Sequence, residues 1–183
     1  MAALPTDDLG PDAQRLRDEL AAKRGTVDGM YLTLLNHPEL TRHVSDLGSY
    51  LRFGATLPGD VRELVILWVA TQLRAGYEWV KHVPTGKEAG LTEETIDDLL
   101  AGRTPGGLSP AQLEALNVAG FVLAGHSIPE AIQDATIEHL GVDGILELVI
   151  LVGFYRMIAG VLSSFDVAMP EGTPDPFPHP DQQ

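Results

Sequence analysis

The fold and the chemistry of this chain depend most on two consecutive stretches, Arg62-Glu63-Leu64-Val65-Ile66-Leu67-Trp68-Val69-Ala70 and Ala75-Gly76-Tyr77-Glu78-Trp79-Val80-Lys81-His82. The first stretch is almost entirely apolar, which indicates a buried helix from about residue 61 to 74. Two carboxylates and an imidazole nevertheless lie within these stretches. Because an unpartnered buried charge is costly, a glutamate in such a run invites a functional interpretation.

Apolar residues recur at helical spacing through most of the chain, and no strand-like alternation bounded by hairpin turns stands out. Turn and capping residues divide the pattern into expected helices. These are 13–24, 30–35, 38–53, 61–74, 77–89, a segment starting at 92, 110–124, a segment ending near 139, and 143–165. Within this set, Asp60 is expected to cap the fourth helix, Pro84 to kink or restart the fifth, and Ser109 to form a capping box with Gln112 at the start of the helix 110–124. The sequence therefore predicts an all-α bundle with two long buried helices, 61–74 and 143–165.

One domain is expected, since 183 residues are enough to bury a sizeable core. We expect a flexible lead at 1–12, a helical domain at 13–169 and a tail at 170–183. The tail holds five prolines and few apolar residues, so we expect it to be extended or disordered, or to lie on a neighbour.

The first apolar segment also has an internal echo. Glu63-Leu64-Val65-Ile66-Leu67 recurs as Glu147-Leu148-Val149-Ile150-Leu151, and Ala75-Gly76 recurs as Ala159-Gly160 at the same offset. This repetition predicts two related halves. The positions of Glu78 and His82 correspond to Leu162 and Asp166, so only the first half carries the glutamate–histidine pair.

Charge and composition exclude several function classes. The formal net charge is -14, from 26 acidic and 12 basic residues, and this repels nucleic acids and anionic membrane surfaces. The chain has no cysteine, which excludes disulfides, thiolate nucleophiles and dithiol redox chemistry. No secretory signal is visible and no apolar run approaches ~20 residues, so we expect a cytoplasmic protein with no membrane span.

Glu78 and His82 are four residues apart, so on one helix they share a face. A carboxylate beside an imidazole fixes its tautomer and prepares it for proton transfer near neutral pH. If the chain turns back at Gly76, Glu63 on the preceding helix can reach the same histidine. The alternative is an ordinary set of ion pairs, with Glu63 bound to Arg62, Arg52 or Arg74.

A metal site is weakly supported, because one histidine with two carboxylates lacks the second histidine of a facial triad.

Aromatic side chains at helical spacing are more often core than ligand contacts. If a pocket opens between the long helices, some of them would line it, namely Trp68, Tyr77, Trp79 and Tyr155.

The segment 62–90 resembles the carboxymuconolactone decarboxylase family, which shares its fold with the AhpD-type alkylhydroperoxidases. The resemblance extends from about 37 to 167 and is carried by Leu51-Arg52-Phe53, by Tyr77-Glu78-Trp79-x-x-His82-Val83-Pro84, by Glu88-Ala89-Gly90-Leu91 and by Asp166-Val167. In AhpD-type members, a glutamate precedes a Cys-x-x-Cys and a histidine. The glutamate aligns with Glu63, the cysteines with Ala75 and Glu78, and the histidine with His82. Peroxide reduction by that dithiol is therefore excluded.

The resemblance implies an all-helical protomer in a homo-oligomer, a trimer or hexamer. We also expect no cofactor, because such a decarboxylation needs none, and no metal. We expect a lyase that decarboxylates a small cyclic or unsaturated acid. The expected roles are His82 as proton donor, Glu78 as its orienting partner, Glu63 as a second acid/base and Arg52 as an anchor for the substrate anion. An isomerase or cyclase using the same groups, a non-catalytic ligand-binding protein and an oligomeric scaffold remain alternatives.

Overall fold

The computed structural model describes residues 9–24, 27 and 29–178, and the expected flexible lead at 1–12 lies mostly outside them. The described residues form eight α-helices and one π-helix and contain no strand, which confirms the all-α prediction. The helices are α1 (Pro11–Arg24), α2 (Met30–Leu34), α3 (Pro38–Ser49), η1 (Tyr50–Gly54), α4 (Gly59–Gln72), α5 (Gly76–Glu88), α6 (Glu93–Leu100), α7 (Pro110–Ala124) and α8 (Glu130–Ser164).

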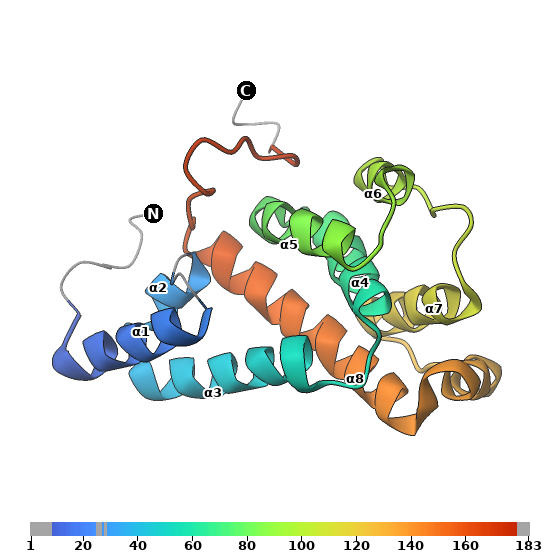
Figure 1. Cartoon of the computed structure of the whole chain (residues 1–183), viewed down its shortest axis with the longest axis horizontal. Coiled ribbons are helices and arrows are strands. Elements are labelled where there is room, and N and C mark those ends of the chain that lie inside the picture. The colour runs from blue at the N-terminus through green and yellow to red at the C-terminus, as the bar shows by residue number, and fades with distance from the viewer. Residues whose placement is uncertain (1–8, 25–26, 28, 179–183) are drawn as a thin grey trace.

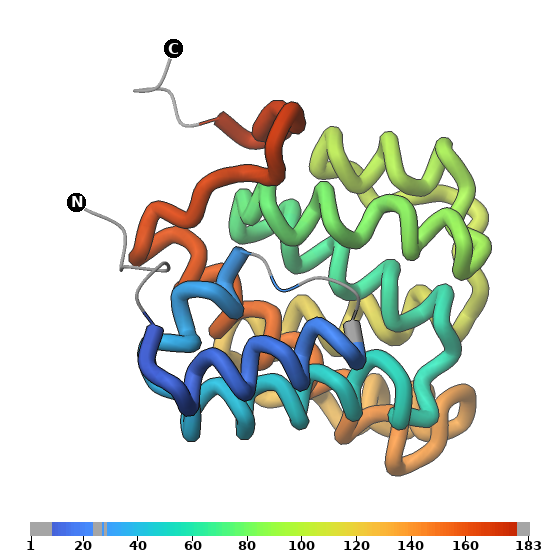
Figure 2. Tube along the Cα trace, turned by 60° about the vertical axis from the view of Figure 1, so that its left-hand side comes forward, coloured from blue at the N-terminus to red at the C-terminus, as the bar shows by residue number. Residues whose placement is uncertain are grey.

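The core is built around α4, which packs against α5, α7 and α8. Eight of its fourteen residues are buried, in agreement with the predicted buried helix. Figure 1 shows α8 crossing the molecule, with α1, α2 and α3 on one side and α4 to α7 on the other. In the turned view of Figure 2, α1 lies alongside α3. A small separate apolar cluster lies beneath α1, formed by Ala13, Leu16, Leu20 and Leu35.

The two copies of the internal echo fold differently. The first copy lies within α4. After this helix the chain turns at Leu73–Ala75, with Arg74 in the left-handed region (φ 52°), and α5 starts at Gly76. The second copy lies in α8, which continues through Ala159 and Gly160 to Ser164. Only the first copy therefore doubles back, and this brings α5 against α4.

The helix expected at 38–53 changes character near its end. After α3, the segment η1 winds as a π-helix, with the amide of Ala55 donating to the Tyr50 carbonyl at 2.8 Å. Single-turn π segments are rare and often accompany functional sites. This turn carries Arg52.

Some local signals are confirmed and others need correction. Ser109 forms the expected capping box with Gln112. Asp60 does not cap α4, whose N-cap is Pro58; its carboxylate instead accepts from the Gln112 side chain at 3.0 Å. Pro84 does not restart the helix, because α5 stays helical from Gly76 to Glu88, and the expected kink stays a prediction.

The last helix, α8, holds a non-helical residue, Gly141 (φ 74°, ψ 172°), which separates its two expected parts. By length and composition alone, α8 is apolar enough to cross a membrane. However, 56% of its most apolar 18-residue segment is buried within the protein, as is common for the core helix of a soluble protein.

The described part of the tail packs on its own chain. The ring of Phe177 is buried and meets Trp79 of α5 edge to face at 5.7 Å between centroids. The Arg74 guanidinium donates to the Pro178 carbonyl at 3.0 Å. Residues 179–183 of the predicted tail lie outside the described residues.

Candidate functional site

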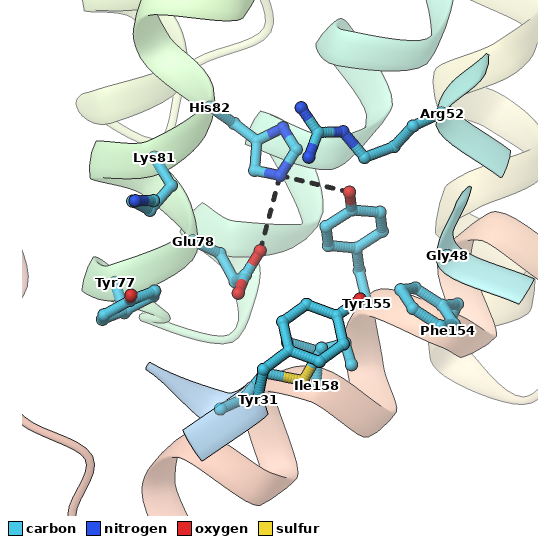
Figure 3. Close-up of a pocket in the computed structure, with 11 residues that line it drawn as sticks. Tyr31, Gly48, Arg52, Tyr77, Glu78, Lys81, His82, Phe154, Tyr155 and Ile158 are labelled. Atoms are coloured by element: carbon cyan, nitrogen blue, oxygen red, sulfur yellow. Dashed lines mark hydrogen bonds and ion pairs between the residues drawn. The ribbon is translucent and has the colours of Figure 1, made fainter. Parts of the chain in front are cut away.

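A cavity of about 260 Å³ opens between α2, the α3–η1 segment, α5 and α8 (Figure 3). Both apolar and titratable side chains line it. The lining residues are Met30, Tyr31, Gly48, Arg52, Tyr77, Glu78, Lys81, His82, Phe154, Tyr155 and Ile158.

His82 is buried on α5 with its two ring nitrogens in different surroundings. Its Nδ1 lies 2.7 Å from a carboxylate oxygen of Glu63 on α4, so the turn at Gly76 does bring these side chains together. Because a carboxylate only accepts, the Nδ1 proton points at Glu63 and the other nitrogen, Nε2, faces the cavity.

Glu63 is fully buried and remains a carboxylate. Burial by itself raises the pKa of Glu63, but the hydrogen bond and charge of His82, followed by those of Arg62, outweigh burial and lower it. The Arg62 Nε donates to the second carboxylate oxygen at 3.2 Å. Both oxygens of Glu63 are thus occupied, and the ion pair with Arg62 coexists with the histidine contact.

The cavity side of the imidazole meets two further groups. The hydroxyl of Tyr155 on α8 lies 3.1 Å from Nε2, and a carboxylate oxygen of Glu78 lies 3.5 Å from it (Figure 3). Burial, followed by the charges of Glu78 and Glu63, raises the pKa of Tyr155 well above its usual value. The tyrosine therefore stays protonated and can donate a hydrogen bond, either to Nε2 or to a ligand.

The two glutamates contact opposite nitrogens of the His82 ring. The sequence predicts Glu78 as the orienting partner and Glu63 as a second acid/base. In the structure, Glu63 contacts Nδ1 from behind the ring and does not line the cavity, while Glu78 lies in the cavity on the Nε2 side. The reason is the antiparallel packing of α4 on α5, which aims Glu63 at Nδ1.

Arg52 reaches the cavity from η1, with its guanidinium on the same side as His82 and Tyr155 (Figure 3). It also lies over the Phe53 ring, 5.0 Å from the centroid. Tyr77 and Tyr155 line the cavity as expected. Lys81, one residue before the histidine, places a second cation at the cavity and was not foreseen from the sequence.

Trp68 and Trp79 do not line the cavity, and the expectation that they do is corrected. Trp68 packs on the core from α4, and Trp79 packs against the tail through Phe177. Tyr31 and Phe154 provide aromatic walls instead. Helical spacing gave no signal for Tyr31, because the short helix α2 reaches the cavity only through tertiary packing.

Within the described part of the chain, no group of three histidine or acidic side chains is arranged to hold a metal ion. The absence of a cofactor and of a metal stays a prediction.

Comparison with known proteins agrees with the fold and the resemblance predicted from the sequence. Residues 38–120 match the profile of the Carboxymuconolactone decarboxylase family. This segment runs from α3 into α7 and contains Arg52, Glu63, Glu78 and His82. The resemblance predicted from the sequence is confirmed. A search of curated proteins finds no match.

Solved structures show the fold. An uncharacterized peroxidase-related protein from Ralstonia eutropha JMP134, described as an alkylhydroperoxidase AhpD core, matches with a TM-score of 0.77 at 19% identity over 93% of each chain. A peroxidase-related protein from Silicibacter sp. TM1040 matches with 0.77 at 18% identity over 93% of this chain and 92% of its own. The debrominase Bmp8, as a variant bound to 2,3,4-tribromopyrrole, matches with 0.69 at 12% identity over 93% and 91%. The AhpD-like fold is thus confirmed.

Proposed function

We propose that this cysteine-free chain with an AhpD-like fold is a cofactor-free lyase that decarboxylates a small cyclic or unsaturated carboxylic acid. One observation carries the proposal. A buried Glu63–His82 pair presents Nε2 to a cavity that also holds Tyr155, Glu78 and Arg52. With no thiol anywhere in the chain, proton transfer is the chemistry that these groups support.

The cavity suits a small acid with a flat apolar body. Tyr31, Phe154 and Ile158 offer apolar surface, and Arg52 and Lys81 offer positive charge at the same cavity. A guanidinium binds a carboxylate in bidentate fashion, which fixes orientation as well as charge. The debrominase of the same fold was solved with 2,3,4-tribromopyrrole, and this supports a small planar ring as a ligand type for such a cavity.

The reaction needs a carboxylate conjugated to a carbonyl. The bond to the carboxylate carbon breaks, carbon dioxide leaves, and the electron pair moves onto the conjugated carbonyl oxygen. That oxygen becomes an enolate, which hydrogen-bond donors stabilise. Tyr155 is well suited to donate, since its raised pKa keeps the hydroxyl protonated.

The enolate carbon then takes a proton from protonated His82 at Nε2, leaving neutral imidazole. Glu63 stabilises the positive ring through Nδ1 and holds its orientation. Glu78, 3.5 Å from Nε2, is placed to pass a proton from solvent back to the ring. Carbon dioxide and the protonated product are the only products, so no oxidant or reductant is required.

The test is a screen of small unsaturated cyclic acids for carbon dioxide release, with products identified by mass spectrometry. His82→Ala is expected to lower turnover of an accepted acid by ~10²–10⁴-fold, the usual contribution of a proton-transfer group. Glu63→Gln is expected to lower it as well, because it removes the charge that orients and stabilises the imidazolium ring. Glu88→Gln is the matched control, because Glu88 is an exposed glutamate on the same helix as Glu78. Turnover at the parental rate in both site variants would contradict the proposal.

The same screen separates the alternatives. A product of unchanged mass would indicate an isomerase or a cyclase acting through the same groups. Saturable binding without turnover, unaffected by Glu78→Gln, would indicate a non-catalytic ligand-binding protein.

We also propose that the protein acts as a homo-oligomer, a trimer or hexamer. Large apolar side chains exposed on one helix support this, namely Leu146, Ile150 and Met157 on α8. Light scattering of the purified protein tests it, and a species at the single-chain mass of 19.7 kDa would contradict it. The predicted cytoplasmic location stays a proposal.

A further inference from the structure

The carboxylate of Glu147 is buried on α8 but does not line the cavity. It accepts from the Tyr50 hydroxyl at 2.7 Å, from the Thr56 hydroxyl at 2.9 Å, and from the amides of Thr56 and Leu57 at 2.9 and 3.1 Å. One acidic side chain therefore holds the chain at two points, before and after Arg52.

Those two points bracket η1. Tyr50 begins this π-helix, and Thr56 follows its end at Gly54 by two residues. π segments are rare and occur mostly as single turns, so contacts from outside such a segment help to hold it in place. The hydrogen bonds to Glu147 supply that support from α8, the same helix that provides Phe154 and Tyr155 to the cavity.

We propose that Glu147 is a positioning residue for Arg52: it fixes η1 against α8 so that the guanidinium stays at the cavity beside His82 and Tyr155. This inference rests on the proposed function only in taking Arg52 as the anion-binding group. The placement of Arg52 is a separate and directly measurable property.

The ionised form of Glu147 is the one that does this. Burial by itself raises the pKa of Glu147, but the hydrogen bonds from Tyr50, Thr56 and Leu57 outweigh burial and lower it. A glutamine at 147 is uncharged and offers one acceptor oxygen instead of two, so its amide group must replace one of the two oxygens that accept from Tyr50, Thr56 and Leu57. Glu147→Gln is thus expected to loosen η1 with little change in side-chain volume.

The experiment is nuclear magnetic resonance of the purified full chain. The Arg52 Nε–H signal is assigned by its loss in Arg52→Lys, and the His82 Nδ1–H signal by its loss in His82→Gln. In Glu147→Gln, we expect the Arg52 signal to shift or broaden and the His82 signal to stay in place, since Glu63 still holds it. Glu138→Gln is the control, an exposed glutamate on the same helix that should change neither signal.

Tyr50→Phe provides a milder variant, because it removes one of the donors to Glu147 from a half-exposed side chain. It should move the Arg52 signal in the same direction by a smaller amount. An Arg52 signal that stays in place in both variants would overturn the proposal. So would equal disturbance of the His82 signal, which would indicate a general structural role.

A benzoate titration then connects placement to binding. Arg52→Gln and Glu147→Gln should each weaken benzoate binding by about tenfold or more, as expected when a charged hydrogen bond is lost. The double variant should be no weaker than Arg52→Gln alone, because both changes act on one guanidinium. Additive losses would contradict positioning through Arg52. If the unsubstituted protein does not bind benzoate, the anion-binding role in the proposed function fails, while the two resonance signals still decide the role of Glu147.

Discussion

The two copies of the Glu-Leu-Val-Ile-Leu segment each begin with a buried glutamate, but the two carboxylates bind different partners. In α4, Glu63 meets an imidazole and a guanidinium, and in α8, Glu147 meets a tyrosine, a threonine and two backbone amides. Both carboxylates have a lowered pKa, and both avoid the cost of an unpartnered buried charge. The partner decides the role, since a histidine can transfer a proton and backbone amides cannot.

The local sequences do not explain this difference. What differs is the backbone after each copy: the first turns at Leu73–Ala75 and brings α5 back alongside α4, whereas the second continues straight through Ala159. The returning helix presents His82 to Glu63. In α8, the partners of Glu147 come from η1 and the residues after it, far earlier in the chain.

Truncation of each glutamate is expected to give the largest individual effects. Glu63→Ala leaves His82 and Arg62 without their shared acceptor in the core, so it should lower the free energy of unfolding by about 3–5 kcal/mol. Glu147→Ala should lower it by about 1–3 kcal/mol, because its donors lie nearer the surface and water can replace the acceptor. Urea denaturation measures both.

Glu88→Ala serves as the exposed control and should stay within about 0.5 kcal/mol of the parent. If Glu147→Ala lowered the free energy of unfolding as much as Glu63→Ala or more, the contacts of Glu147 with η1 and the residues after it would contribute at least as much stability as the ion pairs of Glu63.

A fall in pH should reduce the stabilising contribution of both carboxylates, Glu63 and Glu147. Each carboxylate has a folded-state pKa below its ordinary value of 4.5, so its stabilising contribution is complete above that value. The contribution is lost as the pH falls through the lowered pKa, since protonation removes the charge that the partners bind. We expect the stability gap between the parent and either Glu63→Gln or Glu147→Gln to shrink between about pH 5 and pH 2.

Urea denaturation across that pH range provides the measurement. A gap that widens as the pH falls would mean that the carboxylate concerned is destabilised in the folded state, contrary to its hydrogen bonds.

The smallest individual effects are expected at the repeated Ala-Gly dipeptide. A Cβ added at Gly76 would collide with the Asp175 carboxylate of the tail, which accepts from the Phe177 amide. Gly160 lies within α8 with nothing within 4 Å of such an atom. Gly76→Ala should therefore destabilise by about 1–2 kcal/mol, and Gly160→Ala should stabilise by about 0.5–1 kcal/mol.

Thermal unfolding of the two single variants checks these opposite signs. Tryptophan fluorescence adds a local readout, because Trp79 packs on Phe177 and should report displacement of the tail in Gly76→Ala only. Changes of the same sign in both variants would mean that the two dipeptides share one environment after all.

Much of the helical pattern could be read from the sequence because its causes are local. Apolar spacing predicted α4 and α8, and the Ser109 capping box was correctly placed. The errors came from competition between local and tertiary effects. Pro84 stays inside α5 although a proline usually interrupts a helix, and Asp60 bonds to Gln112 in preference to a cap.

The candidate site was predictable as a set of residues and not as an arrangement. Spacing identified Glu78 and His82 as neighbours on one helix face, and the apolar run around Glu63 singled out that glutamate. Arg52 was proposed as an anchor together with the family resemblance. The prediction that Trp68 and Trp79 line the cavity was wrong, because helical spacing indicates that a side chain is buried but not which side of the helix faces the cavity.

The sequence by itself determined the fold class, the absence of thiol chemistry and the residues able to move a proton, since these follow from periodicity and side-chain chemistry. Tertiary structure alone decided that Glu63 lies behind His82, that Glu78 faces the cavity, and that Glu147 holds η1. Each of these depends on where the chain turns and on which helices then pack together, and interactions between residues distant in sequence set both.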